Sequence, residues 1–264
     1  MPSPLAPSPA SDSAARPVAL VTGGAVRIGQ AIGLRLAASG YDIAIHVHRL
    51  DADAEAALAA VEALGARAVL LPAELSDPEA VAALMPAANA RLGSVSLLIN
   101  NASEFHPDTV GSLDAAQWDR HFAVNLRAPV FLAEALAGQL GEQQTGCVIN
   151  LIDQRVLKPT PHYLSYSLTK NALWAATKML AQGLAPRVRV NAVAPGPTLA
   201  NVRQSEDDFA RQRAAVPLGH GPTPDEIAEA VLFLANARSV TGQMLTVDGG
   251  QHLAWQTPDT HVPE

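Results

Sequence analysis

The chain has 264 residues, 48% of them hydrophobic and 16% charged, which suits one large domain or two small ones and excludes disorder throughout. Its 18 basic and 25 acidic side chains give a formal net charge of −7, which argues against broad binding to nucleic acid or anionic membranes. No apolar run approaches the roughly 18 residues of a membrane helix. The single cysteine, Cys147, excludes an internal disulfide framework and a multi-cysteine metal cluster, so we expect a reducing, cytoplasmic setting.

Residues 1–16 are Pro, Ser and Ala with almost no large side chains. Such a segment cannot offset its ordering entropy by burial, so we predict a disordered N-terminal tail. It lacks the basic start and apolar stretch of a secretory signal. Residues 17–264 are then predicted to form a single domain.

From residue 17 to about residue 250, short β-rich runs alternate with Ala/Leu-rich stretches of helical period. The predicted strands are 17–22, 42–47, 66–71, 95–100, 147–152, 187–193 and 243–247. The predicted helices are 29–38, 52–64, 78–91, 115–139, 163–184 and 224–236. Strands that are apolar on both faces and alternate with helices indicate βαβ units. The sequence therefore predicts an α/β fold of the Rossmann type: one doubly wound, mostly parallel seven-stranded sheet with helices on both faces, and ligands at the carboxyl ends of the strands.

The first strand runs into TGGAVRIGQAIG, which then opens a helix. Gly23 and Gly24 allow a tight turn, and Gly29 allows the helix to pack closely. Backbone N–H groups there can receive a pyrophosphate, with Arg27 and Ile28 beside it. A tight turn without a ligand, and a solvated Arg27, stay open as alternatives.

The second strand ends in IHVHRLD, where NAD-specific enzymes place a carboxylate that binds the ribose 2′-hydroxyl. Here Arg49, with His48, suits a 2′-phosphate, so we expect NADPH in preference to NADH. Asp51 lies two residues further on and leaves NADH open. His46 and His48 are spaced like metal ligands, but no third ligand is near in the sequence, so we predict no metal site.

Further cofactor contacts are expected where the other strands end. Glu74, followed by Leu75, is placed to meet the adenine amino group, with a surface turn as the alternative. Asn101 and Ala102 follow the fourth strand, where the coenzyme backbone is expected to pass.

Tyr166 and Lys170 are four residues apart in a predicted helix, so they share one face. A phenol has a pKa near 10, and a neighbouring ammonium group stabilises its anion. Asn125 lies in the preceding helix, where we expect it to orient Lys170 through water; a cap on a helix distortion is the alternative reading.

Together, TGGAVRIG, NNAS, Asn125, YSLTK, NAVAPGPT and VTGQMLTVDGG resemble the short-chain dehydrogenase/reductase family over residues 17–250. The resemblance identifies Asn125, Tyr166 and Lys170 as three of four catalytic positions. The fourth is normally serine and here is Asp153. A carboxylate would repel an alkoxide forming on a carbonyl substrate. For reduction of a C=N bond it can relay the proton that nitrogen needs, and its charge keeps Tyr166 protonated.

Several residues resemble the pteridine reductase branch, which includes short-chain dihydromonapterin and dihydrofolate reductases: Arg27 where the family carries glycine, HxHR, NNASxF, and the Asp–Tyr–Lys spacing. In that branch the arginine contacts pterin and cofactor phosphate, and the aromatic residue, here Phe105, stacks on the pterin. A loop-anchoring Phe105 is the alternative. The resemblance implies a substrate site formed by Arg27, Ser103, Phe105, Asp153, Tyr163 and Tyr166, with Ser103 also near the cofactor.

Two departures from that branch concern the choice of ligand. Leu50 stands where better-known pteridine reductases have serine, and Glu104 and His106 flank Phe105. The first removes a phosphate hydrogen bond and the second alters the polar lining of the pocket.

The resemblance also implies that Pro195 and Gly196 lie along the nicotinamide and that Thr198 reaches its carboxamide or the pyrophosphate. It implies further that residues 195–216 form a substrate loop and lid, and that the chain forms a homotetramer. The sequence thus predicts NADPH-dependent reduction of a small pteridine. Two alternatives remain: a carbonyl or imine reductase acting on another substrate, and a non-catalytic NADP-binding sensor. The intact Asn125, Tyr166 and Lys170 argue against the sensor.

Overall fold

The computed structural model describes residues 16–201 and 203–255. The predicted tail lies outside these residues except for Arg16. The Arg16 guanidinium donates to the carbonyls of Gly65, Ala37 and Tyr41 and pairs with Asp42 at 3.4 Å. Arg16 is therefore part of the folded chain, although it falls within the predicted tail of residues 1–16.

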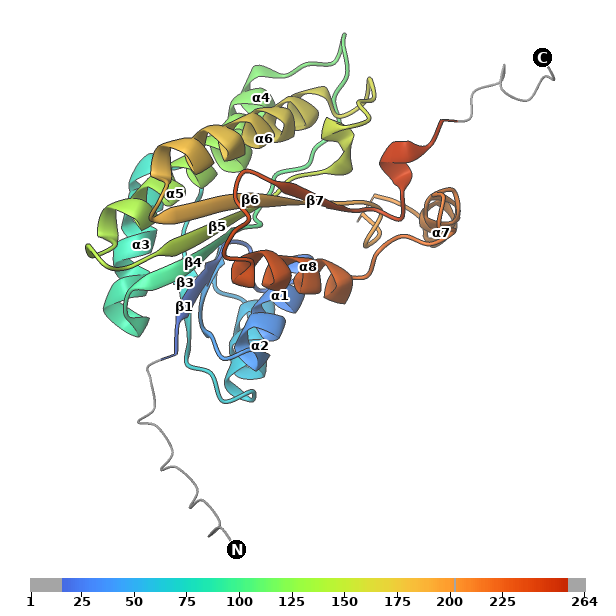
Figure 1. Cartoon of the computed structure of the whole chain (residues 1–264). Helices are drawn as coiled ribbons and strands as arrows, with labels where there is room; N and C mark the ends of the chain where they lie inside the picture. Colours follow the sequence, from blue (N-terminus) through green and yellow to red (C-terminus); the bar gives the residue numbers. More distant parts are fainter. Residues whose placement is uncertain (1–15, 202, 256–264) are drawn as a thin grey trace, which may run out of the picture.

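Seven parallel strands form one sheet in the order β3-β2-β1-β4-β5-β6-β7 (Figure 1). The strands are β1 (Val18–Val21), β2 (Asp42–Val47), β3 (Ala68–Pro72), β4 (Val95–Asn100), β5 (Gly146–Leu151), β6 (Val188–Pro195) and β7 (Met244–Val247). All seven predicted strands are present, and the doubly wound fold is confirmed. The strand order reverses between β1 and β4, which is where folds of this type place a ligand crevice.

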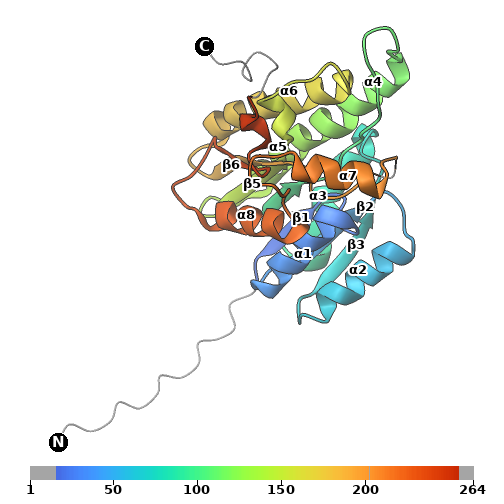
Figure 2. The ribbon, with the colours of Figure 1, turned by 90° about the vertical axis from the view of Figure 1, so that its right-hand side faces the viewer.

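Helices cover both faces of the sheet (Figure 1). One face is covered by α1 (Arg27–Ala38), α2 (Ala52–Glu62) and α8 (Pro224–Asn236), and the other by α3 (Pro78–Leu92), α4 (Ala115–Phe122), α5 (Ala128–Gln139) and α6 (Leu164–Leu184). A further helix, α7 (Glu206–Ala214), lies within the predicted substrate loop, beyond the carboxyl ends of the strands (Figure 2). Among the described helices, none combines the length and apolar character needed to cross a membrane.

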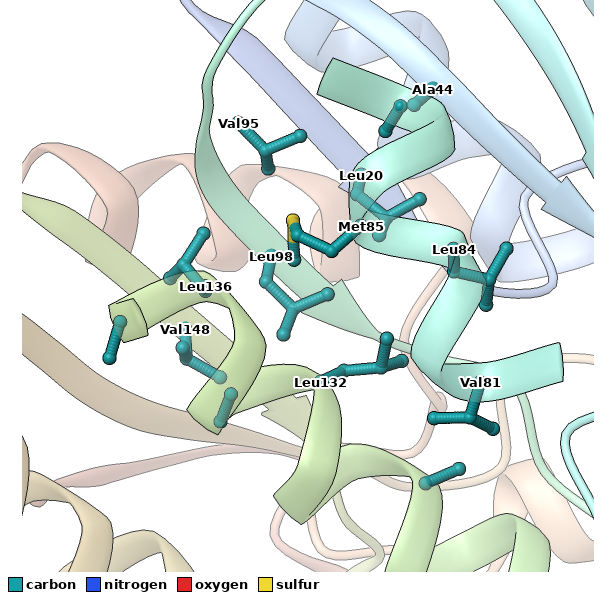
Figure 3. Close-up of a cluster of buried hydrophobic side chains, with 14 of the residues drawn as sticks. Leu20, Ala44, Val81, Leu84, Met85, Val95, Leu98, Leu132, Leu136 and Val148 are labelled. Atoms are coloured by element: carbon teal, nitrogen blue, oxygen red, sulfur yellow. The ribbon is translucent and has the colours of Figure 1, made fainter. Parts of the chain in front are cut away.

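Each face of the sheet has its own apolar core. In one of them, Leu20 of β1 and Leu98 of β4 pack against Met85 of α3 and Leu132 of α5 (Figure 3). These side chains are at most 1% exposed. Burial of such a side chain stabilises the fold by roughly 1.5–3 kcal/mol, so the two layers hold the strand ends in fixed positions.

The predicted helix 115–139 is interrupted. Its middle forms a π-helical turn, η1 (Ala123–Arg127), closed by a bond from the Ala128 N–H to the Ala123 carbonyl. A 3-10 turn, η2 (Gln154–Val156), follows β5, and another, η3 (Gln251–Leu253), follows β7. The first two irregular turns carry residues of the candidate site.

Candidate active site

The glycine turn after β1 is locked by side chains from neighbouring strands. Gly23 has a φ of +60°, and its N–H donates to Nδ1 of His46 at 3.1 Å. Nδ2 of Asn101 donates to the carbonyls of Thr22 and Gly23 at 2.9 and 3.0 Å. A Cβ on Gly29 would lie 2.1 Å from the Gly23 oxygen, so only glycine fits there. The turn therefore holds the start of α1 against the sheet.

His46 is a support for this turn and not a metal ligand. Its Nε2 donates to the Ala73 carbonyl at 3.1 Å, because Nδ1 is occupied as the acceptor from Gly23. Burial lowers the pKa of His46 to about 4, so the ring is neutral at physiological pH. Within the described residues, no group of three or more His, Cys, Asp or Glu side chains is arranged to bind a metal ion.

Arg27 occupies a strained backbone position between two adjoining cavities. Its φ is +55°, a region that disfavours any residue but glycine. Tyr163, at the start of α6, has a φ of +57°, and among the described residues these are the two non-glycine residues with positive φ. Both line the larger cavity. Strain of this kind persists where the surrounding structure enforces it, often at functional sites.

The smaller cavity, of about 380 Å³, lies along the glycine turn and the end of β3. It brings together the predicted cofactor residues Gly23, Arg27, Ile28, His48, Glu74, Leu75, Asn101, Ala102 and Ser103. Glu74 binds Nε2 of His48 at 3.1 Å and Arg120 at 3.3 Å. Burial opposes ionisation of Glu74, but hydrogen bonds from Ser76 and the charges of Arg120 and His48 lower its pKa overall.

Arg49 does not line either cavity. Its side chain is 81% exposed and lies 3.8 Å from the Asp51 carboxylate. That carboxylate also accepts the Ala54 N–H at 3.0 Å and so caps α2. Asp51, the residue that kept NADH open, thus has a structural role at the helix start.

The larger cavity, of about 630 Å³, lies at the carboxyl ends of β4, β5 and β6. It brings together the predicted residues Arg27, Ile28, Asn101, Ser103, Phe105, Asp153, Tyr163, Tyr166, Lys170, Pro195, Gly196 and Thr198. A Cβ on Gly196 would lie 2.6 Å from Cα of Asp248, so this glycine is required for close packing. Asp248 itself accepts the N–H groups of Gly250 and His252, so it stabilises the turn after β7.

Tyr166 and Asp153 both line the larger cavity and contact each other. The Tyr166 hydroxyl donates to Oδ2 of Asp153 at 2.9 Å. Burial raises the pKa of Tyr166 well above its usual value, and the Asp153 charge raises it further. The expectation that the carboxylate keeps this phenol protonated is therefore supported.

Lys170 lies one turn along α6, with Nζ 5.6 Å from the centre of the Tyr166 ring. Its ammonium group donates to the Leu151 carbonyl at 2.9 Å. Burial lowers the pKa of Lys170 to about 8, although the Asp153 charge opposes this shift. The side chain therefore carries a proton at neutral pH.

Asn125 lies in η1 and binds the loop after β4. Its Oδ1 accepts from the Ser103 hydroxyl at 3.1 Å and the Glu104 N–H at 2.8 Å. Its Nδ2 donates to the Glu104 carbonyl at 2.9 Å and to the Thr169 hydroxyl at 3.2 Å. Asn125 thus clamps the loop after β4, and its contact with Lys170 through water stays a prediction.

Phe105 is held on the cavity wall by two aromatic neighbours. Its ring stacks on Tyr163 with centroids 4.3 Å apart and planes 4° from parallel. It meets Tyr166 edge-on at 4.6 Å. The aromatic wall is thus built from two separate loops and the start of α6.

Arg155 lies beside Asp153 and was not predicted from the sequence. Nη1 of Arg155, in η2, lies 3.0 Å from Oδ2 of Asp153, and the Arg155 N–H donates to Oδ1 at 2.8 Å. The motif Asp-x-Arg after the fifth strand is the signal that could have indicated it. Cys147, by contrast, is buried, and burial raises its pKa to about 11.

Comparison with known proteins shows that this chain is similar to reductases. A family model described as enoyl-(acyl carrier protein) reductase matches residues 24–252. The 3-oxoacyl-(acyl-carrier-protein) reductase FabG of Staphylococcus aureus is 30% identical over 240 residues, covering 89% of this chain and 98% of that protein.

Two solved structures are more similar in sequence. The FolM alternative dihydrofolate reductase 1 of Brucella suis, in complex with NADP, is 51% identical with a TM-score of 0.89, covering 92% of this chain and 98% of that one. Its counterpart from Brucella canis, also complexed with NADP, is 49% identical with a TM-score of 0.88 and covers 94% and 99% of the two chains.

Proposed function

Because the chain belongs to the short-chain dehydrogenase/reductase family, we propose that it is an NADPH-dependent pteridine reductase. The proposed reaction reduces the C=N bond of a dihydropterin, such as dihydromonapterin, dihydrofolate or dihydrobiopterin, to the tetrahydro form. Similarity to two NADP-bound alternative dihydrofolate reductases supports this assignment. The observation that carries it is the hydrogen bond between Tyr166 and Asp153.

The residues present fit a dinucleotide phosphate group. Gly23, Ile28 and Gly29 line the smaller cavity at the start of α1. Val26, at the N-cap of that helix, makes no side-chain hydrogen bond to the first turn. The free N–H groups and helix dipole of such a terminus favour an anion. Arg27 lies beside it, and His48 and Arg49 lie on the side where we propose the 2′-phosphate binds.

The catalytic pair suits a reaction at nitrogen. NADPH, when bound, supplies a hydride, and a C=N bond must then gain a proton at nitrogen. The Tyr166 hydroxyl donates a hydrogen bond to Asp153. Tyr166 can therefore give its proton to the substrate nitrogen, and Asp153 can relay a replacement proton from solvent to the phenol oxygen. An alkoxide would instead meet the negative charge of Asp153, which disfavours carbonyl substrates.

The remaining residues hold the two ligands in our proposal. Lys170 binds the nicotinamide ribose and adds positive charge near Tyr166. Phe105 offers a flat face on which a heteroaromatic ring gains by stacking. Asn125 holds the loop that carries Phe105, and Arg27 contacts both ligands from its place between the cavities.

Substitution of Asp153 tests the proposal. In Asp153→Ser we expect loss of pterin reduction by at least about a hundredfold, within the range attributed to general acid–base groups. NADPH binding is expected to survive, because Asp153 is not part of the smaller cavity. Turnover is followed by NADPH absorbance, and binding by protection against thermal unfolding. Unchanged turnover by this variant would remove Asp153 from the mechanism.

A substrate panel distinguishes the alternatives. At fixed NADPH, we expect oxidation with dihydrobiopterin, dihydromonapterin or dihydrofolate and little with a set of ketones. Brisk consumption of ketones alone would assign the chain to carbonyl reduction, the reaction of its 30%-identical FabG relative. Tight NADPH binding without turnover of any substrate would favour a sensor.

We propose in addition that the chain forms a homotetramer in the cytoplasm. Large apolar side chains are exposed on three helices: Phe131 (55%) on α5, Met179 (69%) on α6 and Phe233 (59%) on α8. Such surface favours association with further copies. Light scattering on the eluted protein would measure the assembly, and a monomeric mass would refute it.

A further inference from the structure

Arg155 lies in the wall of the larger cavity and contacts several parts of the candidate site. Its guanidinium carbon is 5.5 Å from the centre of the Phe105 ring and 5.4 Å from that of Tyr163. These nearly equal distances place the group beside the stacked pair, between the levels of the two rings. Its side chain is 20% exposed, so most of it is packed against these neighbours.

The carboxylate of Asp153 is held mainly by Arg155. Oδ1 accepts the Arg155 N–H at 2.8 Å, and Oδ2 lies 3.0 Å from Nη1 of the same residue. Oδ2 also accepts the Tyr166 hydroxyl. One residue thus contributes both a backbone and a side-chain donor, which fixes the direction in which Oδ2 faces the phenol. Charge-assisted bonds of this kind are stronger than neutral ones.

Other charged groups at the cavity have different partners. Lys170 donates to the Leu151 carbonyl, Arg27 to the Leu199 carbonyl and Arg203 to the Phe105 carbonyl. Asp208 of α7 pairs with Arg211. Among the described residues, Arg155 is the cation in direct contact with Asp153. It therefore offsets the negative charge beside the phenol.

We propose that Arg155 is a positioning residue for proton delivery: it aims Asp153 at Tyr166 and balances the carboxylate charge. The proposal rests on the proposed reductase function. Without Arg155, the carboxylate keeps neither the side-chain donor nor the compensating charge, and Tyr166 becomes a weaker acid. The Arg155 charge does lower the pKa of Tyr166, against the larger effects of burial and Asp153.

The test compares Arg155→Met and Arg155→Lys in the full-length chain with NADPH and dihydropterin. We expect kcat of Arg155→Met to fall at least tenfold, with KM for NADPH unchanged within twofold. Arg155→Lys restores a donor and a charge, so we expect it to recover part of the lost kcat. Arg35→Met is the matched control, since Arg35 forms an exposed pair with Glu229 between α1 and α8, and its kcat should equal that of the unaltered chain.

A double variant distinguishes positioning from general structural damage. If Arg155 acts through Asp153, adding Arg155→Met to Asp153→Ser lowers kcat by less than twofold further. A structural role would lower kcat tenfold in both backgrounds and would overturn the proposal, as would a kcat of Arg155→Met within twofold of the unaltered chain. Loss of NADPH binding by Arg155→Met and Arg155→Lys alike would also overturn it. Absence of pterin turnover in the unaltered chain would instead refute the proposed function.

Discussion

Arg27 combines backbone strain with a position between the two cavities. An L-residue in the left-handed region costs roughly 1–2 kcal/mol relative to its ordinary conformation. The guanidinium makes one hydrogen bond to the protein among the described residues, to the Leu199 carbonyl at 3.3 Å. One exposed hydrogen bond contributes about 1 kcal/mol at most, so it does not offset the strain by itself. We infer that Arg27 occupies this position because it binds the cofactor and the pterin that we propose.

Two substitutions of Arg27 separate strain from function. Arg27→Ala removes the guanidinium and keeps the strain, whereas Arg27→Gly removes both. We therefore expect the glycine variant to be more stable than the alanine variant by about 1 kcal/mol, with similarly raised KM values for pterin in both. Urea unfolding and steady-state kinetics provide the measurements. Equal stability of the two variants would contradict the strain argument.

Residue type and spacing were enough to predict part of the site. Tyr166 and Lys170 follow from a four-residue spacing on one helix face. Asp153 was found through the resemblance to the short-chain family, which normally has serine at this position. Arg155 was not predicted because its role depends on a hydrogen bond within a 3-10 turn that has no sequence period. His46 was considered as a metal ligand because the sequence does not show that Gly23 and Ala73 occupy its two ring nitrogens.

At the scale of elements, the loop between β4 and α4 depends on a buried polar network. The Asp108 carboxylate accepts the Ser165 N–H and hydroxyl. Nδ1 of His121 donates to the Ser165 oxygen at 2.6 Å, since Nε2 accepts the His106 N–H at 3.1 Å. Burial lowers the pKa of His121, consistent with a neutral ring. The network fixes the loop that follows Phe105 to α4 and α6.

Ser165→Ala is expected to destabilise the fold by about 1–3 kcal/mol, because it leaves the buried His121 N–H without its acceptor. The loosened loop should raise KM for pterin more than KM for NADPH. Ser167→Ala is the matched control: Ser167 lies on the same helix, is buried, and its hydroxyl has no partner among the described residues. Denaturant unfolding of the two variants gives the comparison, and an equal loss in both would contradict a role for the network.

The regular elements were predictable because their hydrophobic periods match the faces that they bury. The interruption of helix 115–139 was foreseen only in the alternative reading of Asn125, since Ala123, Leu126 and Arg127 are good helix formers. The π turn exists through tertiary contacts: Asn125 bonds to Glu104 and Thr169, which are distant in the sequence. Contacts of this kind follow from the fold and not from local propensity.

At the scale of the whole molecule, the site is assembled from the carboxyl ends of strands that two apolar layers hold in place. His46 links three of these ends, because it lies in β2, accepts from Gly23 after β1 and donates to Ala73 after β3. It is 3% exposed, so protonation of its ring would place an uncompensated charge in the core. The free energy of unfolding should therefore depend on the protonation of His46.

The sign of that dependence follows from the pKa of His46, about 4 in the folded chain against 6.5 as its ordinary value. Between these values the unfolded chain binds the proton and the folded chain does not, so stability falls as pH falls from 6.5 toward 4. At about 1.4 kcal/mol per pH unit, His46 accounts for a loss on the order of 2 kcal/mol between pH 7 and pH 5. His46→Asn does not titrate there and keeps an acceptor for the Gly23 N–H. Between pH 7 and pH 5, the unfolding free energy of this variant, measured in urea, should fall by about 2 kcal/mol less than that of the unaltered chain. The contributions of the carboxylates are the same in both proteins and cancel in this comparison. An equal loss of unfolding free energy in both proteins would show that folding does not lower the pKa of His46.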